Sequence, residues 1–123
     1  MQNIRYVGLD ISEKFIELCR HKYPAVKYYC VDVLEASDLL PNFDYIVMNG
    51  VFTEKRSLGH AEMFDYLRTV LAKVWSISRI GLAFNVMSSR VDWERDDLFH
   101  LPLDMLATFV TSELSRDFVI RND

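Results

Sequence analysis

Two acidic residues, Asp10 and Asp32, each follow a stretch that predicts a strand, and they are the residues best placed for ligand chemistry. The residues before Asp10 include a near-continuous apolar run of Ile4, Tyr6, Val7 and Leu9. Such a run is typical of a parallel strand covered by helices on both faces. Ligands of open parallel α/β sheets bind at the carboxyl ends of the strands. A carboxylate there can accept hydrogen bonds from both hydroxyls of a ribose. We therefore predict a nucleoside site at Asp10, with helix capping or a turn as the alternative.

Helix and strand patterns alternate along the first part of the chain. Ser12 is a good helix cap, and Pro24 stops the helix that begins there. The buried side of this helix is expected to consist of Phe15, Ile16, Leu18 and Cys19. A second strand is predicted over residues 26–31, and a short helical turn or irregular crossover over residues 33–40.

The same alternation continues to the end of the chain. We predict a third strand over residues 43–48, a polar loop over 51–59 and the longest helix over 60–77, where apolar residues follow a three-and-four spacing. A fourth strand over 79–86, a charged loop over 87–101, a helix over 103–114 and a fifth strand starting at 118–120 complete the pattern. Strands that alternate with helices predict an α/β fold with a mostly parallel sheet, here as one domain over residues 1–123.

Composition limits the partners and the compartment. The 123 residues carry a formal net charge of -4, which argues against nucleic acid as the main partner. No segment is apolar for long enough to span a membrane, and the first residues lack the plan of a signal peptide. Cys19 and Cys30 have neither metal-site spacing nor disulfide density, so we expect two free, buried thiols in a reducing cytoplasm.

Four segments, taken together, resemble the class I S-adenosylmethionine-dependent methyltransferases. They are residues 7–12 with the helix that follows, residues 31–33, residues 43–52 and residues 81–86. The resemblance spans nearly the whole chain in the right order. It implies a Rossmann-like three-layer sandwich, S-adenosylmethionine as the cofactor, and methyl transfer to an acceptor. The absence of a basic patch and of an added recognition domain favours a small-molecule acceptor.

The resemblance also implies cofactor contacts for residues that follow three of the strands. Asp10 would bind the ribose hydroxyls, and Ile11 would pack on the adenine. Asp32 would lie near the adenine amino group, with Val33 beside it, although this segment could simply open the crossover helix. The dipeptide Asn49-Gly50 would form the floor under the methionine part and the reacting methyl, with plain turn chemistry as the alternative.

The loop after the fourth strand would face the methyl acceptor and brings Trp93 and His100 to it. The alternative for Trp93 is an aromatic anchor for the loop, and for His100 a surface or helix-end histidine. We predict no metal site, because the acidic run over residues 92–97 has no recognisable ligand spacing. We assign no catalytic residue, since alignment of the sulfonium methyl with a nucleophile can supply most of the rate.

The chain departs from the family at both ends. Its four glycines are scattered, so it lacks the glycine-rich loop under the methionine end of the cofactor, and the final antiparallel hairpin is cut. We therefore expect an incomplete domain with an incomplete cofactor site. The family's first strand is the central one, so the strands that end at Asp10 and Asn49 must pair directly, leave open edges or borrow a strand. This predicts a homo-oligomer or a rearranged sheet.

Two other functions are compatible with the same residues. One is a fragment of an NAD-type Rossmann oxidoreductase, in which an acid after the second strand also binds ribose. That fold has its own glycine fingerprint, which this chain lacks as well, and Ile11 after Asp10 favours the methyltransferase. The other is a non-catalytic remnant that assembles through exposed sheet edges.

Overall fold

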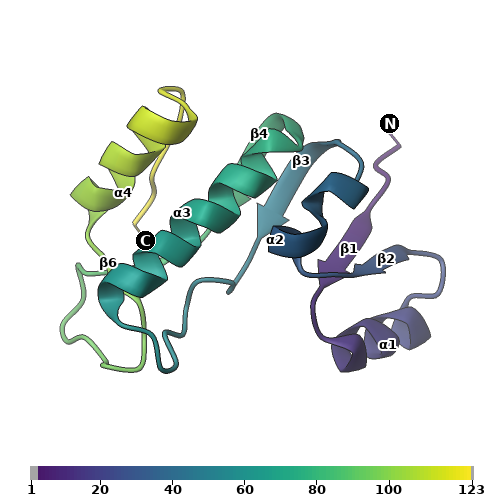
Figure 1. The fold of residues 1–123 in the computed structure, drawn as a ribbon, viewed down its shortest axis with the longest axis horizontal. Coiled ribbons are helices and arrows are strands. Elements are labelled where there is room, and N and C mark those ends of the chain that lie inside the picture. The colour runs from purple at the N-terminus through teal and green to yellow at the C-terminus, as the bar shows by residue number, and fades with distance from the viewer. Residues whose placement is uncertain (1–2, 123) are drawn as a thin grey trace. The chain divides into compact units, whose positions relative to one another are not determined.

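The computed structural model describes residues 3–122 of the chain. The chain forms two compact units, Met1–Leu40 and Pro41–Asp123. Each unit contains strands paired in parallel, and helices connect or cover them (Figure 1). The α/β class and the parallel pairing predicted from the alternation of strands and helices are confirmed.

The first unit is built on the parallel pair β1 (Val7–Asp10) and β2 (Lys27–Cys30). The helix α1 (Glu13–Lys22) connects these strands and packs on them. It begins where predicted, because Oγ of Ser12 accepts a hydrogen bond from the backbone N–H of Phe15. The crossover that follows β2 consists of α2 (Val33–Ala36) and the short 3-10 helix η1 (Ser37–Leu39).

A tyrosine ring lies over a glycine of the neighbouring strand in both main sheets. Tyr28 is opposite Gly8, and a Cβ atom at Gly8 would lie 2.5 Å from Cδ1 of Tyr28. In the second unit Tyr45 is opposite Gly81, where a Cβ atom would lie 3.1 Å from Cδ1 of the ring. These glycines therefore make room for the rings. Desolvation raises the pKa of Tyr28, and the nearby Cys19 thiol adds to this effect.

The first unit is less buried than its sequence predicts. The strand β1 begins at Val7, and Ile4 and Tyr6 before it are exposed. Leu9 within the strand is 43% exposed, so the prediction of cover on both faces is wrong. In α1 only Ile16 is buried, and Phe15 and Leu18 are exposed, which corrects the predicted buried side. The physical reason is that one amphipathic helix covers only one face of a two-stranded sheet.

The second unit is organised around the helix α3 (His60–Ser76), which connects the parallel strands β3 (Phe43–Met48) and β4 (Ser78–Phe84). The bounds of β3 agree with the prediction. The apolar side of α3 supplies much of the core of this unit through Met63, Leu67, Val70, Leu71 and Val74. The helix packs on β4 through its apolar residues.

The end of the second unit packs on another side of α3. The helix α4 (Leu103–Phe109) continues into the π-helical turn η2 (Val110–Leu114), in which the backbone N–H of Ser115 donates to the carbonyl of Val110 at 2.8 Å. Arg68 of α3 pairs with Glu113 of this turn. The contacts hold the last helical segment against α3 (Figure 1).

The loop predicted over residues 87–101 contains two very short strands, β5 (Met87–Ser88) and β6 (His100–Leu101), which pair in parallel. The fifth strand predicted to start at residue 118 is wrong, because the described residues 115–122 form neither helix nor strand. A strand needs a neighbouring strand to accept its backbone hydrogen bonds, and these residues pair with no strand in the described part of the chain.

The described strands form three two-stranded sheets. Among residues 3–122, β1 pairs with β2 alone and β3 with β4 alone, so one edge of each strand has no strand partner. Open edges, one of the three outcomes expected for the strands that end at Asp10 and Asn49, are present in the described residues. No described helix is both long enough and apolar enough to cross a membrane.

Candidate functional site

The carboxylate of Asp10 is held in place at the end of β1. Its Oδ1 accepts a hydrogen bond from the backbone N–H of Ser12 at 2.8 Å, and its main-chain carbonyl accepts one from Val31 at 3.1 Å. Within the described residues, Oδ2 has no hydrogen-bond partner, and the side chain is only half-buried. One oxygen therefore fixes the orientation of the carboxylate, and the other is free to accept a ligand hydroxyl.

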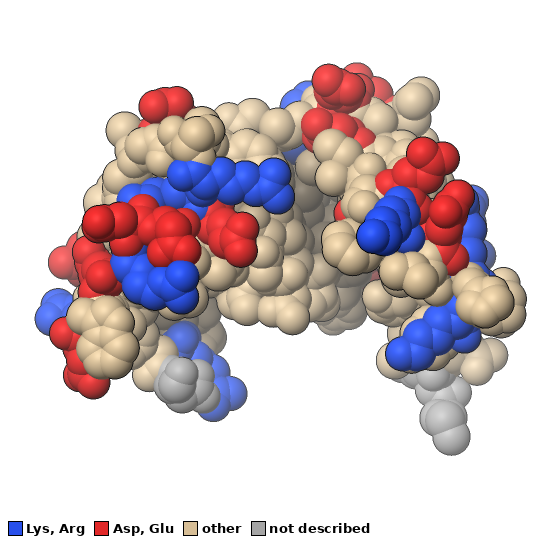
Figure 2. Space-filling model, turned by 90° about the horizontal axis from the view of Figure 1, so that it is seen from below, with Lys and Arg blue, Asp and Glu red and all other residues tan. Residues whose placement is uncertain are grey.

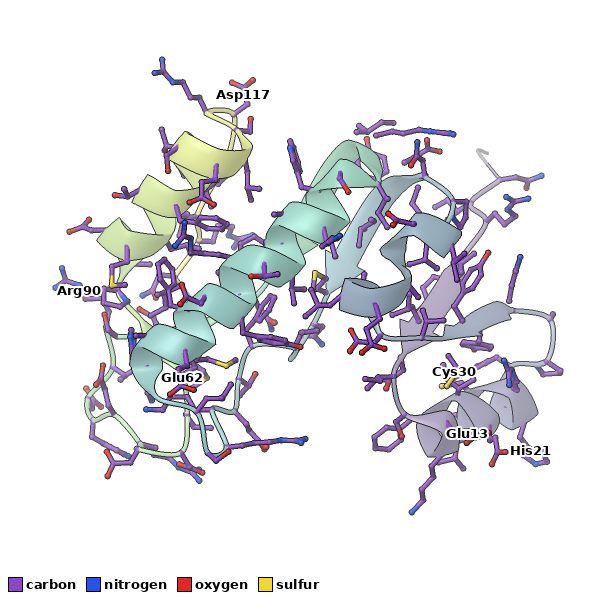
Figure 3. The ribbon with its side chains drawn as sticks, viewed as in Figure 1. Glu13, His21, Cys30, Glu62, Arg90 and Asp117 are labelled. Carbon is purple, nitrogen blue, oxygen red and sulfur yellow. The ribbon has the colours of Figure 1, made fainter. Side chains whose placement is uncertain are left out.

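Ile11 presents an apolar surface next to this carboxylate. Its side chain is 68% exposed, and its carbonyl is 3.7 Å from the thiol of Cys30, which can donate to it. Figure 3 shows Cys30 projecting from β2 toward α1. Cys30 is exposed and Cys19 is half-buried, so the prediction of two buried thiols is wrong. The chain thus offers an acidic acceptor and an exposed apolar side chain in successive residues, which suits the ribose and the flat base of a nucleoside.

Asp32 caps the crossover helix. Its Oδ1 accepts from the backbone N–H of Leu34 at 2.9 Å, and its carbonyl accepts from Ala36 at 2.9 Å. The capping interpretation of this segment is therefore confirmed. Asp32 and Val33 are both half-buried. The adenine-binding role that the resemblance gives them stays a prediction.

Asn49 and Gly50 form a turn directly after β3, and Asn85, directly after β4, joins them. The backbone N–H of Gly50 donates to Oδ1 of Asn85 at 2.8 Å, and Nδ2 of Asn85 donates to Oδ1 of Asn49 at 2.7 Å. Gly50 has a φ of 75°, which a glycine adopts without strain. The turn interpretation is confirmed. The sequence analysis missed Asn85, because it placed this residue inside a strand over residues 79–86, whereas β4 ends at Phe84.

His100 is buried, and both of its ring nitrogens are engaged. Nε2 accepts from the backbone N–H of Arg95 at 3.2 Å, and Nδ1 is 2.9 Å from the carbonyl of Ser88. Because a backbone N–H can only donate, Nδ1 carries the proton and donates to Ser88. The imidazole thus closes the loop between β5 and β6. An acceptor-binding role would require one of these bonds to open.

The loop that carries Trp93 is tied to the loop after β3. The backbone N–H of Phe99 donates to the carbonyl of Thr53 at 2.9 Å, and the backbone N–H of Lys55 donates to the main-chain carbonyl of Asp97 at 3.0 Å. Trp93 itself is 74% exposed, so it does not anchor the loop.

Arg95 binds both carboxylate oxygens of Asp97, at 3.0 and 2.7 Å, and this hydrogen bonding lowers the pKa of Asp97.

Two hollows on the second unit are lined by none of the candidate site residues described above. One, of about 190 Å³, is lined by Ser89, Arg90, Pro102, Leu103 and Asp104. The other, of about 460 Å³, lies along α3 and is lined by Asp65, Arg68, Thr69, Ala72, Lys73 and Glu113. Figure 2 shows a face on which acidic and basic side chains lie interspersed, without an extended basic patch. In the described part of the chain, no three His, Cys, Asp or Glu side chains gather so that they could hold a metal ion.

Comparison of the chain with protein-family models, with curated proteins and with solved structures gives no match.

Proposed function

We propose that this chain is a domain of an S-adenosylmethionine-dependent methyltransferase that acts on a small-molecule acceptor. The observation that carries the proposal is the carboxylate of Asp10 at the end of β1, with Oδ1 fixed by Ser12 and Oδ2 open beside the exposed Ile11. The acid and the apolar residue stand where the first unit's parallel strands end, which is the edge at which α/β sheets bind nucleotides.

Each proposed contact uses a residue of this chain. Asp10 accepts hydrogen bonds from the ribose hydroxyls, and Ile11 packs on the adenine. Asp32 and Val33 contact the adenine edge, which leaves the capping bond from Leu34 to Asp32 intact. When bound, the cofactor supplies the electrophilic methyl group, and the residues of the chain bind and orient the cofactor.

We propose that the fold is a Rossmann-like sandwich. In the second unit, α3 packs on β4, and the apolar residues Tyr45 and Val47 of β3 are 68% and 75% exposed. Apolar residues exposed on a strand fit an architecture in which a further layer covers that face. Two free thiols, Cys19 and Cys30, fit a reducing compartment such as the cytoplasm.

The open strand edges support a homo-oligomer as part of the proposal. β1 and β3 each lack a strand partner on one side in the described part of the chain, and such edges pair readily with other chains. Pairing between copies would satisfy the backbone groups of these edges.

Calorimetric titration with S-adenosylhomocysteine tests the nucleoside site. Asp10→Asn is the sharpest variant, because its amide oxygen still accepts from Ser12 while the charged acceptor for the ribose is lost. We expect affinity to fall by about tenfold or more, since a hydrogen bond to a charged group contributes roughly 1.5–3 kcal/mol. Glu17→Gln on the exposed side of α1 is the matched control and should bind as the unchanged chain does. Absence of binding by the unchanged chain at about millimolar ligand would overturn the proposal.

A further inference from the structure

The side chains of Asn85 and Asn49 form a linked pair at the carboxyl ends of β4 and β3. Met48 and Phe84 are paired in the parallel register, so the next residue of each strand lies at the same edge of the sheet. The hydrogen bond from Asn85 to Asn49 is 2.7 Å long, and Gly50 donates to Asn85 at 2.8 Å. All three residues are exposed and belong to the second unit.

The backbone fixes the orientation of both amides. Because the N–H of Gly50 can only donate, Asn85 must turn its oxygen toward Gly50 and its nitrogen toward Asn49. Asn49 must then turn its own oxygen toward Asn85, which directs its NH₂ group away from the pair. In the described residues, neither hydrogen of Asn49 Nδ2 and only one hydrogen of Asn85 Nδ2 has a protein acceptor.

The turn that carries this pair is anchored in the core. Phe52, two residues after Gly50, is fully buried and packs edge-on against Phe84 and Tyr66, with ring centroids 6.3 and 6.2 Å away. A Cβ atom built on Gly50 would meet no atom within 4 Å, so the space beside the turn is open. The free N–H groups are therefore exposed on a rigid frame, which lowers the entropy lost when a ligand binds.

We propose that Asn49, oriented by Asn85, binds a carboxylate of a small molecule through its outward NH₂ group. The pair offers several unused N–H donors, and neither of its side chains is ionised. Such donors suit an anionic oxygen, because hydrogen bonds to an ionised acceptor are shorter and stronger. Asn49 makes the contact, and Asn85 is a positioning residue. The carboxylate can belong to the amino-acid part of the cofactor or to the methyl acceptor; only this choice of source rests on the proposed function.

Side-chain amide signals in nitrogen-edited NMR spectra of the full chain test the proposal with three probes. S-adenosylhomocysteine carries the carboxylate, 5′-methylthioadenosine carries the nucleoside without it, and acetate carries it alone. We expect acetate to shift the Asn49 amide signal. A shift with S-adenosylhomocysteine but not with methylthioadenosine assigns the carboxylate to the cofactor, and a shift with acetate alone assigns it to the acceptor. No shift of Asn49 with acetate or S-adenosylhomocysteine overturns the proposal, whatever happens at Asp10.

Substitution of Asn85 separates positioning from simple stabilisation. Asn85→Asp keeps an acceptor for Gly50 but presents a second oxygen to Asn49, so the Asn49 amide must reverse and turn its oxygen outward. We expect acetate to bind about tenfold more weakly or worse, while the Gly50 amide stays protected from hydrogen exchange. Asn42→Asp, an exposed asparagine just before β3, makes the same charge change and should bind as the unchanged chain does. Unchanged binding by Asn85→Asp would show a structural role only and overturn the assignment.

Discussion

The imidazole of His100 and the backbone N–H of Arg95 lie 3.2 Å apart, and the nitrogen that accepts this hydrogen bond is Nε2. The other ring nitrogen donates to Ser88, and the carbonyl of His100 accepts from Nε2 of His60 at 2.9 Å. One buried residue thus connects both ends of its loop and the start of α3. The arrangement is that of a structural histidine.

Replacement of His100 by alanine should destabilise the second unit. The variant loses two side-chain hydrogen bonds and leaves a cavity, so we expect the free energy of unfolding to fall by about 2–4 kcal/mol. Both tryptophans, Trp75 and Trp93, lie in this unit, so tryptophan fluorescence in urea measures its unfolding. Glu94→Ala, in the same loop and exposed, should change it by less than about 0.5 kcal/mol. Equal stability of the His100 and Glu94 variants would contradict this role.

The pairing of Arg95 with Asp97 should make the loop sensitive to acid. The pKa of Asp97 is lower in the folded chain than its ordinary value of 3.8. Its contribution to stability is therefore complete above about pH 4 and is lost as the pH falls through the lower, folded-state value. NMR titration of the Asp97 carboxyl should give a pKa below the ordinary value, and Arg95→Ala should raise it. An identical Asp97 titration in both chains would rule out Arg95 as the cause of the lowered pKa.

The contact between Gly8 and Tyr28 predicts that Gly8→Ala destabilises the chain only while the Tyr28 ring is present. Gly8→Ala would place Cβ 2.5 Å from a ring carbon of Tyr28, so we expect a loss of about 1–3 kcal/mol in the free energy of unfolding. Removal of the ring in Tyr28→Ala should make the same Gly8→Ala change nearly neutral or stabilising, because alanine restricts the unfolded chain. Thermal unfolding of the four chains gives the coupling. Additive effects would mean that the ring moves aside.

The open edges and the exposed apolar residues predict self-association. Sedimentation equilibrium should show a mean mass that rises with protein concentration. Leu9→Lys and Val47→Lys place a charge on the exposed positions of β1 and β3 and should shift the chain toward monomer. Thr111→Lys, exposed on η2, adds the same charge elsewhere and should not. A monodisperse monomer at all concentrations would count against an oligomer.

The elements with strong local signals could be predicted closely from sequence. The bounds of β3 agree with its apolar run, and α1 begins at the Ser12 cap because capping depends on neighbouring residues alone. Burial could not be predicted as well. Phe15 and Leu18 follow a helical apolar pattern but are exposed, since burial depends on what packs against the helix.

The candidate site shows the same division. Asp10 and Asn49 could be found because strand ends are visible in a sequence. The role of Asn85 depends on a register between two strands and on an amide orientation set by Gly50, and neither is a local property. The role of His100 likewise depends on partners 5 and 12 residues away that the fold brings to its ring.

Because of the π-helical turn at the end of α4, one residue could be removed from this segment without breaking the helix. A π-turn is equivalent to a single residue inserted into an α-helix. Deletion of Thr111 would allow Val110–Leu114 to continue as a regular α-helix, with the following residues turned by about 100° around the axis. Glu113 would then leave the side that faces Arg68. The extra residue thus fixes how the residues after it are rotated about the helix axis, and with that which of their side chains face α3.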